Sequence, residues 1–326
     1  MTDHFSLLKN TGVYNAISAD KNNGTLSHAY LLVTPDAENL GEYLKILAKL
    51  ITCKEISPCG VCRSCKAIDS DSYSDVLSYP KEKGSILSGD IENIISESYI
   101  KPIENDKKIF LLNSAETMNT SAQNKLLKTL EEPPQNVIIL MGATTDYPLL
   151  PTVLSRVKKF NLPSFSDEML FSALREECID EEKLRYAIAC GDGTVGRAKA
   201  LYQDENLKKV SELVFDVLVN MKSSKDVLEF SNKIAKLPDF KEFVSVLELT
   251  LRDLLCFYQG KERLIKNEKD IEKLKLAYNF NTGSVLYALE KITEANKRKK
   301  FNSNPVMLTE WLLFSILEGK YKWQKF

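Results

Sequence analysis

Four cysteines in one short segment are the residues of this chain whose types and spacing most directly indicate chemistry. Cys53, Cys59, Cys62 and Cys65 lie within thirteen residues in the spacing C-x5-C-x2-C-x2-C, and Gly60 eases the tight turn among them. Four thiolates can surround a tetrahedral zinc ion and leave no coordination position for water, so the sequence predicts a structural zinc site. Free or pairwise-oxidised thiols are the alternative interpretation.

The segment between Val33 and Leu40 lies where nucleotide-binding α/β domains hold phosphate, directly after the first clear strand. Phosphate binding there requires glycines, because backbone N–H groups wrap a phosphate only where no Cβ intervenes, and a lysine that supplies positive charge. The segment contains neither residue type, and Asp36 and Glu38 would repel a triphosphate. The sequence therefore argues against ATP binding at this turn and favours an ordinary strand-to-helix connection.

Arg156 is a charged residue at a position where chemistry is expected. It follows the short run Leu149 to Leu154 and Ser155, beyond a predicted strand at Val137 to Met141. The carboxyl end of a parallel sheet is the edge where such sheets place their functional residues. Arg156 is therefore a candidate functional residue, although a surface arginine in a salt bridge is the simpler interpretation of this residue alone.

The elements that must position these residues alternate between strand and helix up to Pro163. Short apolar runs bounded by polar residues predict parallel strands, and Thr120 and Gln123 have the spacing of a capping box at the start of a helix that Pro133 stops. The sequence predicts an open, doubly wound parallel sheet with helices on both faces in residues 1–163. The predicted strands are 29–33, 76–79, 109–112, 137–141 and a possible edge strand at 157–160, and the predicted helices are 41–51, 90–99 and 120–132.

No strand is predicted after Pro163, so the fold class is α/β followed by all-α. Three helices, 167–178, 181–190 and 194–203, predict a small helical domain at 164–204. The remaining residues, 205–326, predict an all-helical bundle that assembles subunits. Its predicted helices are 206–221, 224–235, 240–258, 270–279, 284–297 and 305–317.

Composition limits the class of protein. The 326 residues include 44 basic and 45 acidic ones, so the net charge of -1 gives no general sign of nucleic-acid binding, although a local basic patch is compatible with it. No run of eighteen apolar residues and no signal-peptide pattern occur, which predicts a protein that is neither secreted nor membrane-spanning. Of the 7 cysteines, Cys178, Cys190 and Cys256 are expected to be small core residues. Clustered cysteines in an odd total favour a metal site in a reducing cytoplasm.

Several short strings form a recognisable set. They are His28-Ala29-Tyr30-Leu31, NKLLKTLEEPP at 124–134, LLPTVLSR at 149–156 and the cysteine group, with weaker matches at 191–198 and 302–305. Together these strings resemble the AAA+ subunits of clamp loaders, and the resemblance runs from about Ser27 to Leu317. It implies an AAA+ α/β domain at 1–163 with an inserted zinc module at 53–65, a lid domain at 164–204, a collar domain for oligomerisation at 205–326, and work in cytoplasmic DNA replication.

Departures from the family pattern predict a subunit that does not bind or hydrolyse ATP and is no enzyme by itself. Asn113-Ser114 stand where an ATPase needs an Asp-Glu pair to hold magnesium and polarise water. Arg156 matches the family's arginine finger, which implies a role in trans at the nucleotide of a neighbouring subunit. Val157 replaces the usual third residue of a Ser-Arg-Cys triplet. The short Cys53 to Cys59 spacing leaves open zinc bound by three cysteines and a different fourth ligand.

The resemblance also implies partners. These are other clamp loader subunits, the sliding clamp indirectly, and primer-template DNA within the assembled complex, with no membrane. Zinc is the expected cofactor, in a structural role. An ATP-hydrolysing clamp loader subunit and a zinc-dependent nucleic-acid-binding adaptor remain alternative functions.

Other basic residues have two interpretations each. Lys125 and Lys128 lie on the polar face of the predicted 120–132 helix and are expected either to contact DNA or to be solvated. The run Lys297 to Lys300 suits either DNA or a helix C-terminus. Arg197, which begins a helix, is expected to pair with an acidic neighbour.

Overall fold

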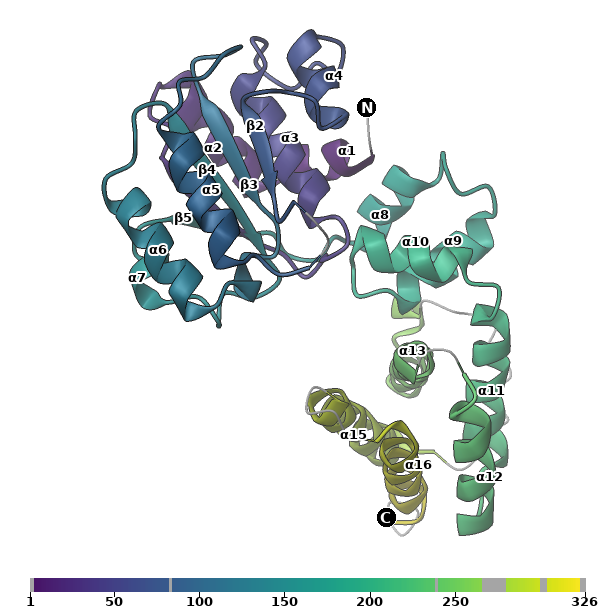
Figure 1. Ribbon diagram of the computed structural model, residues 1–326. Coiled ribbons are helices and arrows are strands. Elements are labelled where there is room, and N and C mark those ends of the chain that lie inside the picture. The colour runs from purple at the N-terminus through teal and green to yellow at the C-terminus, as the bar shows by residue number, and fades with distance from the viewer. Residues whose placement is uncertain (1–2, 82–83, 238–239, 266–279, 300–303, 323–326) are drawn as a thin grey trace. The chain divides into compact units, whose positions relative to one another are not determined.

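The computed structural model describes residues 3–81, 84–237, 240–265, 280–299 and 304–322 (Figure 1). The chain divides into two compact units. The first comprises Met1–Glu177 and Gly193–Arg197, and the second comprises Cys178–Asp192 and Ala198–Phe326. No described helix is long and apolar enough to cross a membrane.

A parallel sheet of five strands forms the centre of the first unit, as the sequence predicts. The strands are β1 (Ala29–Val33), β2 (Val76–Tyr79), β3 (Lys108–Leu112), β4 (Val137–Ala143) and β5 (Lys158–Asn161). Their order is β2-β3-β4-β1-β5, and all neighbouring pairs are parallel, with β5 at the edge. Val33 pairs with Ala143, so the carboxyl ends of β1 and β4 reach the same edge of the sheet.

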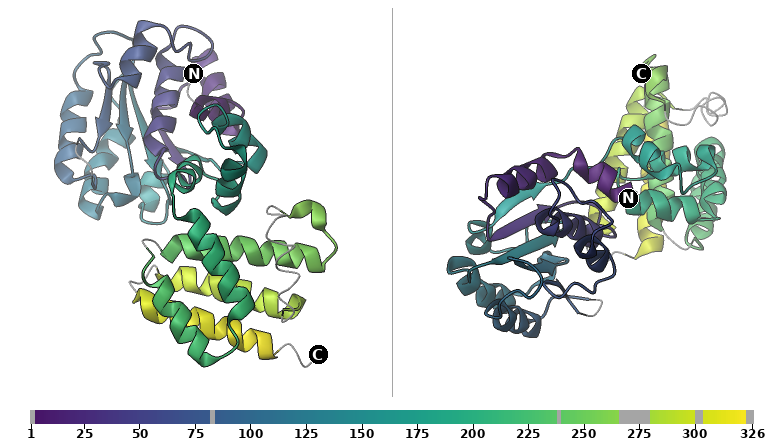
Figure 2. Two further views of the ribbon diagram at one scale, coloured as in Figure 1. Left: turned by 90° about the vertical axis from the view of Figure 1, so that its right-hand side faces the viewer. Right: turned by 90° about the horizontal axis from the view of Figure 1, so that it is seen from above.

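Helices cover both faces of this sheet. Figure 2 shows α5 (Ser88–Ser98) and α6 (Thr120–Glu131) on one face, and α2 (Gly12–Asn22) and α3 (Leu40–Thr52) on the other. The apolar side chains alternate in the period of two that strands impose. Leu31 and Phe110 pack with Ile94 of α5 and Leu126 of α6 in one buried cluster. The prediction of a doubly wound sheet is therefore confirmed.

Four helices of the first unit were not predicted by the sequence analysis. These are α1 (Asp3–Lys9), α2, α4 (Arg63–Asp69) and α7 (Pro151–Leu154), whereas α8 (Asp167–Leu174) corresponds to the predicted helix 167–178. The predicted helix 167–178 is wrong at its end, because α8 stops at Leu174 with Arg175 as its C-cap.

The predicted capping box of α6 is also wrong. The N-cap is Asn119, whose side chain accepts a hydrogen bond from the backbone N–H of Ala122 at 2.8 Å. Asparagine is a strong N-cap residue because its short side chain reaches the unsatisfied N–H groups of the first turn. Gln123 therefore has no capping role: it is buried, and its amide bonds to other backbone groups.

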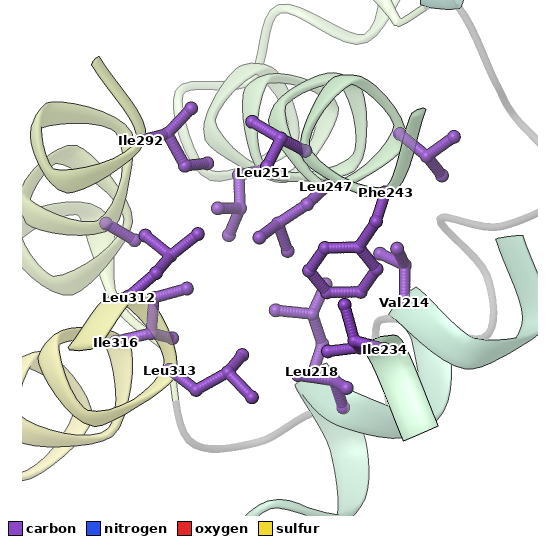
Figure 3. Close-up of a cluster of buried hydrophobic side chains, with 14 of the residues drawn as sticks. Val214, Leu218, Ile234, Phe243, Leu247, Leu251, Ile292, Leu312, Leu313 and Ile316 are labelled. Atoms are coloured by element: carbon purple, nitrogen blue, oxygen red, sulfur yellow. The ribbon is translucent and has the colours of Figure 1, made fainter. Parts of the chain in front are cut away.

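The second unit is helical, as predicted. Its helices are α9 (Glu181–Cys190), α11 (Leu207–Asn220), α12 (Ser224–Ile234), α13 (Phe240–Tyr258), α15 (Thr282–Lys299) and α16 (Pro305–Lys322), and α10 (Val195–Gln203) starts in the first unit and ends in the second. Figure 3 shows Phe243 and Leu247 of α13 and Leu312 of α16 within a cluster of buried apolar side chains. This cluster holds the unit together by burying apolar surface.

Parts of the sequence-based picture stay predictions. The predicted helix 270–279, Lys300 and Asn302-Ser303 lie outside the described residues. The finer division into a lid at 164–204 and a collar at 205–326 is an interpretation that the two compact units do not test. Cys178 and Cys190 are buried as expected, but Cys256 is only partly buried.

Candidate functional site

The four predicted cysteine ligands lie together. Helix α3 ends at Cys53, a turn at Gly60 with φ of +71° follows, and Cys62 is the N-cap of α4. The sulfur atoms of Cys53, Cys59, Cys62 and Cys65 all lie within 4.8 Å of one another, and those of Cys53 and Cys62 are 4.0 Å apart. All four cysteines are free thiols in this arrangement.

The thiols of this cluster have different electrostatic surroundings. The N–H groups of Val61 and Cys62 lower the pKa of Cys59 to about 6, whereas burial raises the pKa of Cys65 to about 12. The ammonium group of Lys21 donates to the carbonyls of Cys53 at 2.5 Å and Glu55 at 3.0 Å, which fastens the segment to α2.

This arrangement fits a zinc ion. Zn–S bonds of about 2.3 Å in a tetrahedron place sulfur atoms about 3.8 Å apart, close to the spacing seen here. Two of the cysteines, Cys53 and Cys65, are buried, and no other described side chain completes the group. All four cysteines can therefore serve as ligands in a closed site, which would supply cross-linking of the segment and no open position for chemistry.

The loop between β1 and α3 is occupied by its own acidic side chain. Asp36 is buried, with 2% of its surface exposed. Its carboxylate accepts hydrogen bonds from the Nδ2 of Asn39 at 3.0 and 3.2 Å and from the hydroxyl of Tyr43 at 3.0 Å. It also accepts from the backbone N–H of Val195 at 3.0 Å and of Gly196 at 3.4 Å, in the first turn of α10. The sequence analysis identified Asp36 only as a repulsive charge, and nothing local to the loop indicates these partners.

The end of β3 contains the two residues that replace a magnesium-binding pair. Ser114 has a left-handed backbone with φ of +59°, and the Oδ1 of Asn113 is buried without a hydrogen-bond partner among the described residues. The next carboxylate along the chain, Glu116, accepts from the backbone N–H of Thr144 at 3.0 Å and from its hydroxyl at 2.6 Å. Glu116 therefore fastens the end of β3 to the end of β4, a role that the sequence analysis missed.

Arg156 lies between α7 and β5, with 34% of its side chain exposed. It precedes Lys158 of β5, which pairs with Tyr30 near the start of the parallel strand β1, so Arg156 lies at the amino edge of the sheet. The expected position beyond the carboxyl end of the sheet is therefore wrong. Its Nη2 forms an ion pair of 2.8 Å with the Oε1 of Glu131 at the end of α6. Its Nη1 donates to the carbonyl of Thr152 at 2.8 Å and to the hydroxyl of Ser155 at 3.1 Å. The guanidinium is thus held at the surface of the first unit by contacts that water and salt can weaken.

Gln123 positions the segment that carries Arg156. Its amide nitrogen, Nε2, donates to the carbonyls of Met118 and Pro148, each at 3.0 Å, and its Oε1 accepts from the N–H of Leu150 at 2.7 Å. Gln123 is buried, and Leu150 is the N-cap of α7. One side chain of α6 therefore fixes the start of the short helix that precedes Arg156.

The structure also shows the surroundings of the other basic residues that the sequence analysis named. Lys125 forms an ion pair with Glu92 of α5, while Lys128 is exposed. Arg298 lies 4.0 Å from the ring centre of Trp311 and pairs with Glu294. The Nε and Nη2 of Arg197 are buried without a hydrogen-bond partner among the described residues, so neither atom makes the expected pairing with an acidic neighbour.

Comparisons with known proteins now bear on this arrangement. A family model described as DNA polymerase III, delta subunit, matches residues 9–166. The DNA polymerase III subunit delta' of Bacillus subtilis is 26% identical over 316 residues, which cover 94% of this chain and 94% of that protein. The chain is therefore similar to DNA polymerase III subunit delta' over almost its whole length. The resemblance inferred from the strings at 124–134 and 149–156 is thereby confirmed.

Two further matches are more distant. The DNA polymerase III subunit tau of Bacillus subtilis is 22% identical over 327 residues, which cover 91% of this chain and 58% of that protein. A gamma subunit-related protein of DNA polymerase III from Thermotoga maritima aligns with 18% identity and a TM-score of 0.47, over 93% of this chain and 99% of that one. The similarity to the delta' and tau subunits supports a role in the clamp loader of DNA polymerase III, and hence in DNA replication.

Proposed function

We propose that this chain is a delta'-like subunit of the DNA polymerase III clamp loader that does not bind ATP. It supplies Arg156 to the ATP held by a neighbouring gamma/tau-type subunit and so helps to load the sliding clamp onto primed DNA. The observation that carries this proposal is the contrast between the two ends of the sheet. A partly exposed guanidinium is available before β5, at the amino ends of the strands, while the loop at the carboxyl end of β1 that would hold a phosphate is filled by Asp36.

The chemistry of Arg156 suits a role in trans. A guanidinium is always charged and presents several donors in one plane, which matches the oxygens of a γ-phosphate. As the phosphoryl group transfers, negative charge develops on those oxygens, and an arginine finger stabilises it. The ion pair with Glu131 is exposed and therefore weak, so a phosphate of a neighbouring subunit can displace it.

Charge and space both argue against ATP binding by this chain. The loop from Thr34 to Asn39 has no lysine and no glycine, and the buried carboxylate of Asp36 takes the backbone N–H groups that an anion would need. A triphosphate would add like charge beside Asp36 and Glu38. By itself the chain is therefore no enzyme, and it acts as part of the polymerase holoenzyme.

The other parts of the chain have supporting roles in this proposal. The cysteines Cys53, Cys59, Cys62 and Cys65 bind one structural zinc ion. The helical bundle at 205–326 acts as the collar that joins this chain to gamma/tau-type and delta-type subunits. Primer-template DNA lies within the assembled complex in the cytoplasm, and the sliding clamp is an indirect partner.

The test combines two measurements on purified proteins. Equilibrium dialysis of the isolated chain with labelled Mg-ATP should detect no binding, with a gamma/tau-type subunit as the positive control. Reconstitution with gamma/tau-type and delta-type subunits should yield one complex by native mass spectrometry, whose DNA-stimulated ATPase requires this chain. Stoichiometric ATP binding by the isolated chain would identify it instead as an ATP-hydrolysing subunit. Salt-dependent DNA binding by the chain alone would favour a nucleic-acid-binding adaptor.

A further inference from the structure

Asp36 is a buried carboxylate whose hydrogen-bond partners come from several segments of the first unit. A buried charge is tolerated only when hydrogen bonds replace its lost hydration. Asn39 and Tyr43 supply three bonds from the same side of the sheet, and Val195 and Gly196 supply two backbone N–H groups from a segment about 160 positions away in sequence. The carboxylate therefore joins the β1–α3 loop to the first turn of α10.

The first turn of α10 is a suitable partner for an anion. The first N–H groups of a helix have no partner within the helix, and its dipole places partial positive charge there. The N–H of Val195 points to the Oδ2 of Asp36 at 3.0 Å. In nucleotide-binding α/β folds, phosphate groups bind at the N-terminus of the helix that directly follows a strand, which here is α3 and not α10. At α10 a side chain of the protein itself provides the negative charge.

Gly196 shows how closely the two segments approach. A Cβ at this position would lie 2.6 Å from the Oε2 of Glu38, 2.8 Å from the Cβ of Glu38 and 2.9 Å from the Oδ1 of Asp36. Contacts that short do not occur between real Cβ atoms and their neighbours, so any larger residue would push the loop and the helix apart. The sequence therefore provides both the anion and the room that it needs.

Asn39 is itself held by a contact from α1. The Nε2 of His4 in α1 lies 2.8 Å from the Oδ1 of Asn39, while the Nδ2 of Asn39 donates to both oxygens of Asp36. The ring of His4 also packs edge-on against Tyr43, with ring centres 5.9 Å apart. Helix α1, the loop and α10 thus meet at one carboxylate within the first unit.

We propose that Asp36 is an internal anion that fixes the first turn of α10 to the β1–α3 loop without any nucleotide. The chain passes into the second unit directly after Arg197, so this joint sets the point at which the chain leaves the α/β unit. A joint closed by a nucleotide would loosen when the nucleotide departs, whereas a joint closed by a side chain is permanent. The inference rests on contacts within one unit and does not depend on the proposed role in clamp loading.

Hydrogen–deuterium exchange of the amides of Val195 and Gly196 in the full chain tests this joint. In Asp36→Ala these amides should exchange about tenfold faster or more than in the wild type, the size expected for loss of a charge-assisted hydrogen bond. Glu38→Ala is the matched control, because it removes the same charge from the same loop, and it should leave both rates within about twofold of the wild type. Unchanged rates in Asp36→Ala would overturn the inference.

A second variant covers the case in which Asp36→Ala does not fold, which exchange at Leu31 and Leu32 of β1 would reveal. Gly196→Ala keeps the carboxylate but inserts a methyl group between the segments, and it should also speed exchange at Val195 about tenfold. Wild-type rates in Gly196→Ala would contradict the close approach and overturn the inference.

Added Mg-ATP separates this inference from the proposed function. With the wild type, Mg-ATP should leave exchange at Val195 and Gly196 unchanged, and slower exchange would show that the joint needs a nucleotide. If labelled ATP binds the chain while both amides are already protected in its absence, the proposed function fails and the internal joint stands.

Discussion

The two units of this protein use their buried polar groups differently. In the first unit, Asp36, Glu116 and Gln123 bind backbone groups of loops at the carboxyl edge of the sheet or directly before α7. In the second unit, a large cluster of apolar side chains supplies the interior, and the buried ammonium group of Lys320 closes the end of one helix. Loops lack the regular hydrogen bonds of helices and strands, so fixing a loop requires side chains that bond to the backbone.

This difference indicates which unit holds its loops and side chains in fixed positions. Apolar packing is non-directional and tolerates small adjustments, whereas a buried hydrogen bond fixes both distance and direction. The first unit places Arg156 through such bonds, and the second unit provides stable helices with little control of individual loops. Four variants test this contrast, each against a matched control.

Arg156→Ala should have the largest effect, because it removes the charge that the first unit positions. In a complex reconstituted with wild-type partners, we expect the DNA-stimulated ATPase of the adjacent site to fall by roughly a thousandfold, the usual size for loss of an arginine finger. Steady-state ATPase assays at saturating DNA measure it. Arg175→Ala removes another exposed arginine of the same unit and should change the rate little. Equal ATPase rates for the wild type and Arg156→Ala would show that the arginine positioned by the first unit has no role in ATP hydrolysis.

Removal of zinc should destabilise the first unit and leave the second largely unaffected. A ligand present at a thousand times its Kd stabilises by about 4 kcal/mol, which corresponds to roughly 10 °C in the unfolding temperature of a domain of this size. Elemental analysis should find one zinc per chain, and chelator or Cys62→Ser should lower the first unfolding transition. Cys256→Ser, outside the cluster, is the control. A chain with no zinc and an unshifted transition would exclude the metal site.

Gln123→Ala should have the next largest effect, because it leaves two carbonyls and one N–H of buried loops unpaired. We expect a loss of roughly 2–4 kcal/mol in the free energy of unfolding, measured by urea denaturation. The exposed neighbour variant Asn124→Ala should cost less than about 0.5 kcal/mol. If both variants unfold alike, the loop before α7 does not depend on Gln123.

Replacement of Lys320 should have the smallest of the four effects, and it tests the second unit. Its ammonium group donates to the carbonyls of Leu218 at 2.7 Å and Met221 at 3.2 Å, and burial, with a minor contribution from Lys222, lowers its pKa to about 8. Between pH 8 and the ordinary lysine pKa, the unfolded chain binds more protons than the folded one, so this group adds stability as the pH rises.

The free energy of unfolding of the wild type should therefore increase relative to that of Lys320→Met by on the order of 1–2 kcal/mol between pH 8 and 10. Urea titrations at pH 7.5, 9 and 10 measure the difference. Lys322→Met, at the exposed end of α16, is the control and should show no such slope. A difference that stays constant with pH would show that Lys320 is not held in a buried, charge-penalising environment.

The sequence by itself determined the five strands and the helices α3, α5 and α6 between them, because the periods of apolar residues depend only on local geometry, but it missed α1, α2, α4 and α7. It also predicted the cysteine cluster, whose members are close in sequence, and short strings indicated a family resemblance with Arg156 as a candidate residue. The relationship to the DNA polymerase III subunits agrees with those strings. Helix ends were less certain: Asn119 rather than Thr120 caps α6, because several polar residues near a helix start compete for the same N–H groups.

Only the tertiary structure decided what fills the β1–α3 loop. Asp36 looked repulsive in sequence, but its partners at Val195 and Gly196 come from a distant segment, and no local pattern records such a meeting. The same holds for Glu116 with Thr144 and for Gln123 with Pro148. A buried polar residue has a meaning only through the groups that satisfy it, and the fold alone brings those groups together.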